Sequence, residues 1–169
     1  MILYPNEYFN NVREIDINFL KENNIRALIL DVDNTLIDFY KKMPDGTKQW
    51  SSRLKENGIK LCILSNSNHK EKVEKVAKEL EISYFYFGLK PFKFGFKKAI
   101  KYLQEENNNI AVVGDQIFTD IIGANRCRLF SILVKPIQEK DLLITKIKRP
   151  IENKIIKNYI DKRGNKFIT

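Results

Sequence analysis

The chain contains few of the residues on which several large protein classes depend. Its 169 residues include two cysteines and one histidine. Cys62 and Cys127 are too few for a disulfide framework, which indicates a reducing compartment such as the cytosol. Because His69 is the one histidine and no nucleophile-elbow motif occurs, a serine hydrolase triad is poorly supported. No GxGxxG or GxxxxGK[ST] motif is present, which argues against the nucleotide-binding folds built on those loops.

Long apolar stretches are also missing. No run reaches the roughly eighteen residues that a transmembrane helix needs. Residues 1–7 lack the basic start and apolar centre of a signal peptide. We therefore expect a cytoplasmic protein, and a peripheral position at a membrane stays open.

The composition, 43% hydrophobic and 30% charged, is that of a soluble globular protein. We expect a single domain over 1–169, with a lead-in (1–25), a core (26–134) and a basic tail (135–169). The net charge is +9, and the tail holds ten Lys/Arg against four Asp/Glu. Such a tail suggests a polyanionic partner, namely an acidic lipid surface, nucleic acid or a phosphorylated substrate. A solvated terminal helix is the alternative.

Short apolar runs alternate with helical patterns along the core. Because the runs lack polar alternation, they are typical of strands buried on both faces. The predicted strands are Ala27–Val32, Lys60–Ser65, Ser83–Phe87, Ile110–Gly114 and Phe130–Val134. Apolar residues at helical spacing lie between them: Val73, Val76, Ala77 and Leu80; Phe96, Ala99, Ile100 and Leu103; Trp50 and Leu54 before Gly58; and a short helix from Phe118 to Asn125. This alternation predicts an α/β fold with a doubly wound parallel sheet.

Both ends of the chain are expected to pack on this sheet. The lead-in is predicted to be helical or irregular. Tyr4, Tyr8 and Phe9 could cover the core or touch a membrane surface, and covering the core is preferred. A helix is predicted to begin at Pro150, because proline suits the first position of a helix. Its apolar side could close the sheet or lie on a bilayer, and closing the sheet is preferred.

The most informative segment ends the first predicted core strand at Asp31, Val32, Asp33, Asn34 and Thr35. Side chains alternate along a strand, so Asp31 and Asp33 share a side. Two carboxylates so close would repel each other, and one would be driven to take up a proton. A magnesium ion removes this difficulty, since it prefers oxygen ligands and accepts carboxylates together with water and phosphate. An aspartate-rich turn without a ligand is the simpler alternative.

Polar residues also follow the next two predicted strands. Ser65 and Asn66 come after the second strand, where a hydroxyl could donate to a phosphate oxygen. Lys90 precedes Pro91 after the third strand, where its ammonium group could neutralise charge during a transfer reaction. Because the carboxyl ends of parallel strands share one edge of the sheet, these side chains are expected to face the Asp31 turn.

The fourth strand ends in a further acidic motif. Gly114 and Asp115 are followed by Gln-Ile-Phe-Thr and Asp120. Asp115 would complete the carboxylate set of the metal, and Asp120 could return to it from the first turn of a helix. Acids at two strand ends, with Ser65 and Lys90 at the ends between them, make the whole pattern specific.

These four motifs, in this order, resemble the haloacid dehalogenase (HAD) superfamily of aspartyl phosphatases. Among its members the chain is most similar to subclass IIIA and the YqeG group. The phrases that carry this likeness are Gly114–Asp120, Gly123–Arg126 and Ser131–Val134. The group is related to the mitochondrial phosphatidylglycerophosphate phosphatase of cardiolipin synthesis.

The resemblance implies a reaction in two displacements. Asp31 would be the nucleophile that forms an aspartyl-phosphate, and Asp33 the acid and then the base. Lys90 would stabilise the transferring group. Mg²⁺ would be bound by the Asp31 carboxylate, the backbone carbonyl of Asp33 and Asp115, with Asp120 orienting a water. The candidate substrate-binding residues are Thr35, Ser65, Asn66 and Lys90.

No room is left for a cap domain over this site. Ile37–Asp45 can form only a short flap, and 24 residues separate Ser65 from Lys90. An open site together with a basic tail suits an anionic phospholipid such as phosphatidylglycerophosphate at a membrane surface. The alternatives are a soluble sugar phosphate or nucleotide as substrate, a neighbouring subunit that acts as the cap, and a non-enzymatic RNA- or ribosome-associated protein. Nucleic acid is disfavoured because no RNA-binding signature occurs.

Overall fold

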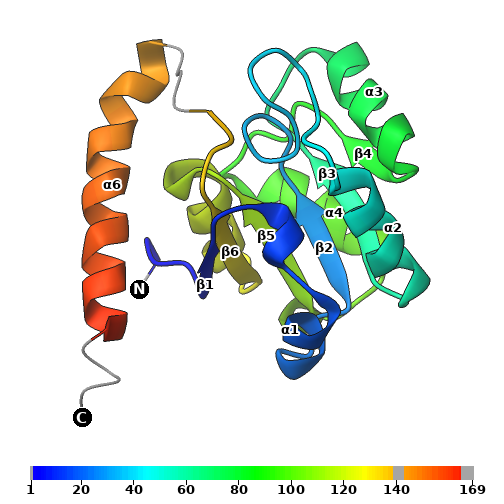
Figure 1. Ribbon diagram of the computed structural model, residues 1–169, viewed down its shortest axis with the longest axis horizontal. Coiled ribbons are helices and arrows are strands. Elements are labelled where there is room, and N and C mark those ends of the chain that lie inside the picture. Colours follow the sequence, from blue (N-terminus) through cyan, green and yellow to red (C-terminus); the bar gives the residue numbers. More distant parts are fainter. Residues whose placement is uncertain (1, 139–142, 165–169) are drawn as a thin grey trace.

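Six parallel strands form the centre of the computed structural model, which describes residues 2–138 and 143–164 (Figure 1). The strands are β1 (Glu7–Phe9), β2 (Ala27–Leu30), β3 (Lys60–Leu64), β4 (Ser83–Phe85), β5 (Ile110–Gly114) and β6 (Phe130–Val134). They lie in the order β1-β6-β5-β2-β3-β4. The doubly wound parallel sheet predicted from the sequence is therefore confirmed.

Helices cover both faces of this sheet. They are α1 (Ile17–Glu22), α2 (Thr47–Glu56), α3 (Lys70–Leu80), α4 (Lys93–Leu103), α5 (Ile122–Arg126) and α6 (Leu143–Gly164). Short 3₁₀ turns span Val12–Glu14 and Asn107–Asn109, and a π-helical turn spans Ile117–Ile121. The predicted apolar stripes of α2, α3 and α4 are buried, apart from the half-buried Ile100.

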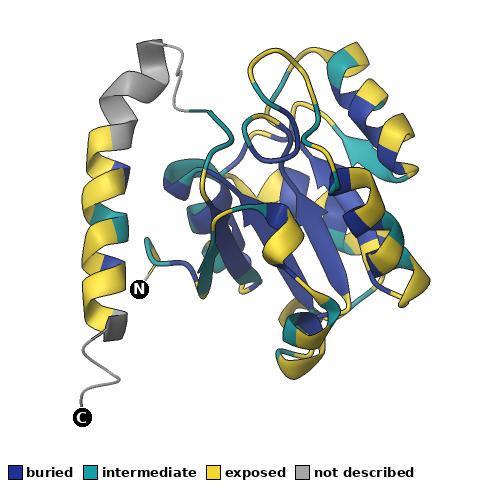
Figure 2. Cartoon of the chain, viewed as in Figure 1, coloured by how far each residue is buried: buried dark blue, intermediate teal, exposed yellow. Residues whose placement is uncertain are grey.

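Two apolar layers sandwich the strands, because successive side chains of a strand point to opposite faces. Leu28 and Leu30 of β2 belong to the layer beneath α2 and α3. Ala27 and Ile29 of the same strand pack with Phe96 of α4 in the opposite layer. Figure 2 shows the central strands buried throughout, which explains why their sequences read as unbroken apolar runs.

The chain reverses its winding direction between β2 and β5. From β2 it continues outward to β3 and β4, and it then crosses back to β5 on the other side of β2. In open parallel sheets, ligands bind beyond the carboxyl ends of the strands at such a switch point. Asp31 and Asp115 follow the two strands that flank it.

The prediction for the lead-in was partly wrong, because it contains a strand. Glu7–Phe9 form β1, which pairs in parallel with Ile132–Val134 of β6. A three-residue edge strand without apolar alternation has no periodicity that a sequence pattern can detect. Tyr8 and Phe9 pack against the core, as expected. The Trp50 indole of α2 donates to the Ile15 carbonyl at 2.8 Å and ties the lead-in to the body.

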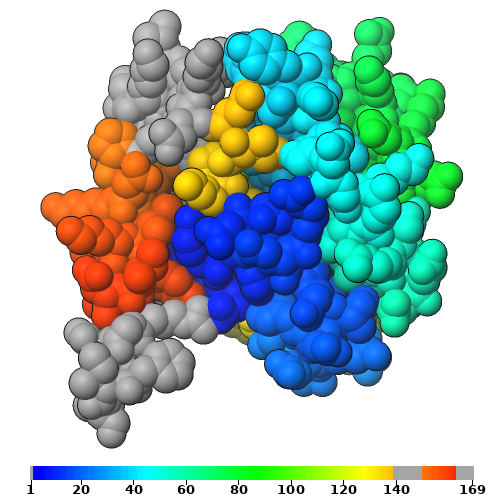
Figure 3. Space-filling model, in the orientation of Figure 1, coloured from blue at the N-terminus to red at the C-terminus, as the bar shows by residue number. Residues whose placement is uncertain are grey.

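The helix predicted to begin at Pro150 begins earlier. Helix α6 starts at Leu143 and contains Pro150 in its interior. The side chains of Ile155 and Ile156 pack near Tyr8, and the Tyr159 hydroxyl donates to the Asn6 carbonyl at 3.2 Å. In Figure 3 the N-terminal segment lies between α6 and the rest of the molecule. Helix α6 therefore packs against the β1 edge of the sheet.

Within residues 2–138 and 143–164, no helix combines the length and apolar character needed to cross a membrane.

Candidate active site

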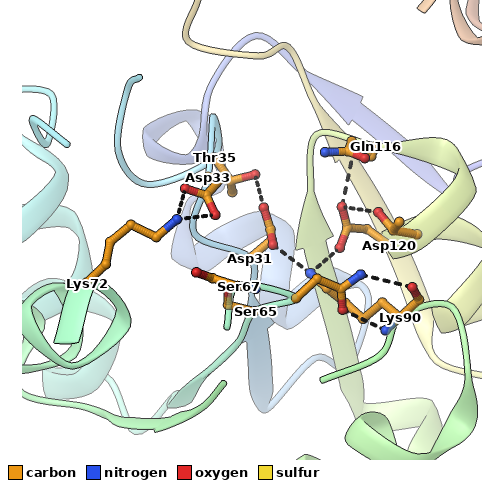
Figure 4. Close-up of polar contacts among 11 residues, drawn as sticks. Asp31, Asp33, Thr35, Ser65, Ser67, Lys72, Lys90, Gln116 and Asp120 are labelled. Carbon is orange, nitrogen blue, oxygen red and sulfur yellow. Dashed lines mark hydrogen bonds and ion pairs between the residues drawn. The ribbon is translucent and has the colours of Figure 1, made fainter. Parts of the chain in front are cut away.

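The site is centred on Asp31, which follows β2 and is buried. One of its carboxylate oxygens, Oδ1, lies 2.6 Å from the Lys90 ammonium nitrogen. The other, Oδ2, accepts a hydrogen bond of 3.1 Å from the Thr35 hydroxyl (Figure 4). Both oxygens are thus held in a fixed orientation.

Lys90 reaches the site from the loop that connects β4 to α4. Its backbone is anchored by Asn66, whose amide oxygen accepts from the Lys90 N–H at 2.6 Å and whose amide nitrogen donates to the Lys90 carbonyl at 2.9 Å. The Lys90 ammonium group is buried and contacts Asp120 Oδ1 as well as Asp31 Oδ1, each at 2.6 Å. One lysine therefore bridges the motif after β2 and the motif after β5.

Three buried carboxylates gather at this bridge. Oxygens of Asp31, Asp115 and Asp120, which we call the carboxylate cluster, all lie within 4.8 Å of one another. The second oxygen of Asp120 accepts from the Gln116 backbone N–H and from Thr119, each at 3.3 Å. A methyl group added at Gly114 would overlap the Asp120 carboxyl carbon. A glycine is needed at the end of β5 because the Asp120 side chain occupies that space.

The three carboxylates and the one lysine that bridges them do not balance one another in charge. Burial raises the pKa of Asp31 to about 7, because Lys90 only partly offsets the cost of removing the carboxylate from water. Burial alone would lower the pKa of Lys90, but the carboxylates of Asp120 and Asp31 raise it above its ordinary value. If all are ionised, three carboxylates and one ammonium group carry a formal charge of −2.

A divalent cation fits this donor set. The three carboxylates supply oxygen ligands, and a charge of +2 would neutralise the excess negative charge of the cluster. Asp33, the other residue predicted near the metal, places its side chain outside the cluster. Its predicted contribution was through the backbone carbonyl, and that role stays a prediction.

The Asp33 side chain instead forms an ion pair that the sequence did not reveal. Lys72 of α3 contacts Asp33 Oδ1 at 2.6 Å and Oδ2 at 2.7 Å (Figure 4). The Asp33 carboxylate is half exposed, in contrast to Asp31. Lys72 is one of several lysines in α3, and only its position in the first turn after the Ser65 loop could have singled it out.

The remaining predicted residues are placed around this centre. Ser65 is buried at the end of β3, and its hydroxyl accepts from the Ser67 N–H at 3.1 Å. In this structure Thr35 contacts the Asp31 carboxylate, and Asn66 contacts the Lys90 backbone. The structure therefore gives Thr35 and Asn66 positioning contacts, while their predicted contacts to substrate stay predictions.

No cap domain is present among the described residues. Residues 38–46 form a loop without helix or strand, and only α3 and β4 lie between Ser65 and Lys90. The Phe39 N–H of this flap donates to the Gln138 side chain at 3.2 Å. The exposed rings of Phe39 and Tyr40 pack edge to face at its tip.

Several known proteins are similar to this chain over most of its length. A Bacillus subtilis protein described as "Probable phosphatase YqeG" is 34% identical over 155 residues, which cover 90% of this chain and 88% of that protein. A glyceraldehyde 3-phosphate phosphatase of Pyrococcus abyssi is 26% identical over 141 residues, 78% of this chain but only 58% of the relative. A crystal structure of an uncharacterised Listeria monocytogenes protein shares the fold, with a TM-score of 0.57 and 22% identity over 70% of this chain and 85% of that one.

The fold and these relatives define a phosphatase, and its motifs resemble those of the haloacid dehalogenase superfamily, subclass III. The family model for the mitochondrial PGP phosphatase matches residues 1–138, and the chain belongs to this family.

Proposed function

We propose that the chain is a Mg²⁺-dependent phosphomonoesterase that removes the terminal phosphate of phosphatidylglycerophosphate. The observation that carries the chemistry is the buried carboxylate cluster, bridged by Lys90 at the switch point of the sheet. The match of residues 1–138 to the PGP phosphatase family supports the choice of substrate. So does the open site, because a lipid headgroup can reach it without passing a cap domain.

The proposed first step is an in-line attack. An Asp31 oxygen bonds to phosphorus while the bond from phosphorus to the ester oxygen breaks, and Asp33 gives its proton to that oxygen. To do so, Asp33 must carry a proton and exchange its contact with Lys72 for one with the leaving oxygen. Lys90 and the Ser65 hydroxyl hold the transferring oxygens.

The second step returns the enzyme to its starting state. Asp33 takes a proton from water, whose oxygen attacks the phosphorus of the aspartyl-phosphate. The bond to Asp31 breaks and inorganic phosphate is released. Mg²⁺, held by Asp31 and Asp115 with the Asp33 carbonyl, would supply positive charge for the phosphoryl oxygens. Asp120 holds Lys90 and would orient a water bound to the ion.

A soluble phosphate ester is the second candidate substrate. The Pyrococcus relative that is 26% identical to this chain is a glyceraldehyde 3-phosphate phosphatase, and its substrate needs no membrane. The residues proposed for the reaction would be the same, because both substrates are phosphomonoesters. The two proposals differ in what lies beyond the phosphate.

Phosphate release from phosphatidylglycerophosphate in mixed micelles tests the proposal, with glyceraldehyde 3-phosphate and other soluble esters beside it. We expect lipid turnover with Mg²⁺, loss of turnover with a chelator, and a decrease of at least about 10³-fold in Asp31→Asn. Asp45→Asn, at an exposed flap carboxylate, is the matched control and should retain activity. Turnover of soluble esters alone would exclude the lipid, and an active Asp31→Asn would exclude the aspartyl-phosphate.

A further inference from the structure

The loop that carries Lys90, together with the first turn of α4, exposes an unusual number of large apolar side chains. Five of them lie within nine residues and together form what we call the aromatic surface. Their exposed fractions are 43% for Tyr86, 55% for Phe87, 44% for Leu89, 65% for Phe92 and 57% for Phe94. Isolated exposed apolar residues are ordinary, but a group such as Tyr86, Phe87 and Phe94, which line one hollow, marks a binding surface.

The backbone of this loop holds two of these residues in an unfavourable conformation. Phe87 and Leu89 have φ angles of 51° and 54°, in the left-handed region where glycine or asparagine is favoured. Neither side chain gains burial in return, since both are exposed. An apolar group that is both strained and exposed is best explained by a role outside the folded chain itself.

The aromatic surface lies next to the reaction centre. The Gly88 N–H donates to the Ser65 carbonyl at 2.8 Å, and the Phe87 N–H donates to the Ser67 carbonyl at 2.9 Å. Between Leu89 and Phe92, the chain turns inward and places Lys90 on Asp31. Whatever binds the aromatic surface is therefore brought to the mouth of the site.

The charge along the segment that carries the aromatic surface has one sign. No acidic residue occurs between Glu81 and Glu105, whereas lysines stand at positions 90, 93, 97, 98 and 101. Of these only Lys90 is buried. The Lys98 ammonium group lies 4.2 Å from the Phe94 ring centroid, so cation and aromatic ring form one patch.

A hollow runs into this patch. It has a volume of about 300 Å³ and is lined by aromatic and apolar side chains, including Tyr86, Phe87 and Phe94, with Lys98 at its edge. Gly88 and Gly95 lie at its wall, where their backbones touch so closely that a methyl group on Gly95 would overlap the Gly88 carbonyl. The hollow offers apolar walls with a cation beside them.

We infer that the aromatic surface docks the enzyme on an anionic lipid bilayer. Aromatic rings that enter the interface and lysines that meet anionic headgroups are the two contributions that bind peripheral proteins to such membranes. A second copy of the chain fits less well, because a symmetric contact would bring two lysine-rich, acid-free patches together. The flap also combines exposed aromatic residues with lysines, because Phe39 and Tyr40 are followed by Lys41 and Lys42. It lies at the same carboxyl edge of the sheet.

This inference rests on the proposed lipid substrate and names the surface that brings the site to it. It differs from an expectation based on the basic tail, because it assigns docking to the loop between β4 and α4. Helix α6 also exposes two large apolar residues, Ile151 and Ile160. These two provide a matched control on a different face.

Co-sedimentation with phosphatidylcholine vesicles, with and without phosphatidylglycerol, tests the docking. The variant is Phe92→Ser/Phe94→Gln, which keeps the charge and places serine at the N-cap of α4, where it is favoured. We expect wild type to bind the anionic vesicles and the variant to bind at least about tenfold more weakly. Ile151→Ser/Ile160→Ser should bind within about twofold of wild type.

Hydrolysis of a soluble ester, p-nitrophenyl phosphate, shows separately whether each variant is folded and active. We expect Phe92→Ser/Phe94→Gln to keep this activity while it loses turnover of vesicle-bound phosphatidylglycerophosphate. Three results would overturn the docking: unchanged vesicle binding by this variant, no vesicle binding by wild type, or a loss of vesicle binding in the α6 control alone. Single-stranded polynucleotide binding or dimer formation that depends on Phe92 and Phe94 would also overturn it. Vesicle binding without lipid hydrolysis would refute the proposed substrate and leave the docking surface intact.

Discussion

The site contains two ion pairs between an aspartate and a lysine, and the two pairs have the same length. Lys90 contacts Asp31 at 2.6 Å, and Lys72 contacts Asp33 at 2.6 Å. The first pair is buried, with side chains 2% and 10% exposed, whereas the second is open to water at 16% and 51%. Distance alone would rank the two contacts as equal.

Their surroundings make them different. Water screens the Asp33 pair, so its net contribution to stability is small. The Asp31 pair lies where charges interact strongly and where an unpaired charge is costly. We therefore expect the two lysines to have different roles. Lys90 is part of a fixed, charged centre, whereas Lys72 holds Asp33 in a contact that is easily exchanged.

Removing the lysine of the buried pair should have the largest effect on stability. Lys90→Met leaves Asp31 and Asp120 buried without their shared cation, and we expect the free energy of unfolding to fall by about 3–5 kcal/mol. Urea denaturation of the metal-free protein at pH 7 measures it. A loss below about 1 kcal/mol would mean that the burial of the pair does not matter.

The buried pair should also make stability depend on pH. The folded-state pKa of Asp31 is raised to about 7, so the proton it binds on folding stabilises the protein most below pH 4. This stabilisation is lost as the pH rises from about 4 to about 7. Relative to Asp31→Asn, metal-free wild type should therefore lose stability across that range and change little above it. Parallel pH profiles of the two proteins in denaturant would refute the raised pKa.

A methyl group added at the end of β5 should displace the Asp120 carboxylate of the buried site by steric overlap. Gly114→Ala overlaps the Asp120 carboxyl group, and overpacking of this kind costs about 1–3 kcal/mol. Because Asp120 holds Lys90, phosphatase activity should fall as well. Gly58→Ala is the control, since Gly58 has a φ of 81° but no atom within 4 Å of the added methyl. It should cost about 1 kcal/mol and leave activity intact.

The exposed pair should show the smallest effect on stability. Lys72→Met removes a screened contact, and we expect a change of about 0–1 kcal/mol in the free energy of unfolding. If Lys72 orients Asp33, phosphate release should decrease while stability stays near wild type. A loss of stability equal to that of Lys90→Met would erase the distinction between the two pairs.

Much of this fold could be predicted because its strands are buried on both faces. Unbroken apolar runs marked β2, β3, β5 and β6 within one or two residues of their observed ends. The edge strand β1 could not be predicted, because three half-buried residues carry no periodic pattern. The start of α6 was misplaced for a related reason. Proline is favoured at a helix start, yet here Pro150 lies inside a helix that begins at Leu143.

The motifs were enough to predict which residues meet at the site. Parallel strands end at one edge, so residues after β2, β3, β4 and β5 had to gather there, whatever the details of packing. Asp31, Lys90, Asp115 and Asp120 followed from this rule and from the motif order.

The motifs did not predict which contacts these residues make. Lys90 joins Asp31 to Asp120, Thr35 and Asn66 hold other members of the site, and Lys72 takes the Asp33 carboxylate. The sequence also did not predict that the aromatic surface beside the site is exposed, because a run of aromatic residues is typical of a buried core. Burial and the partners of a charge depend on contacts between distant segments, which no local pattern encodes.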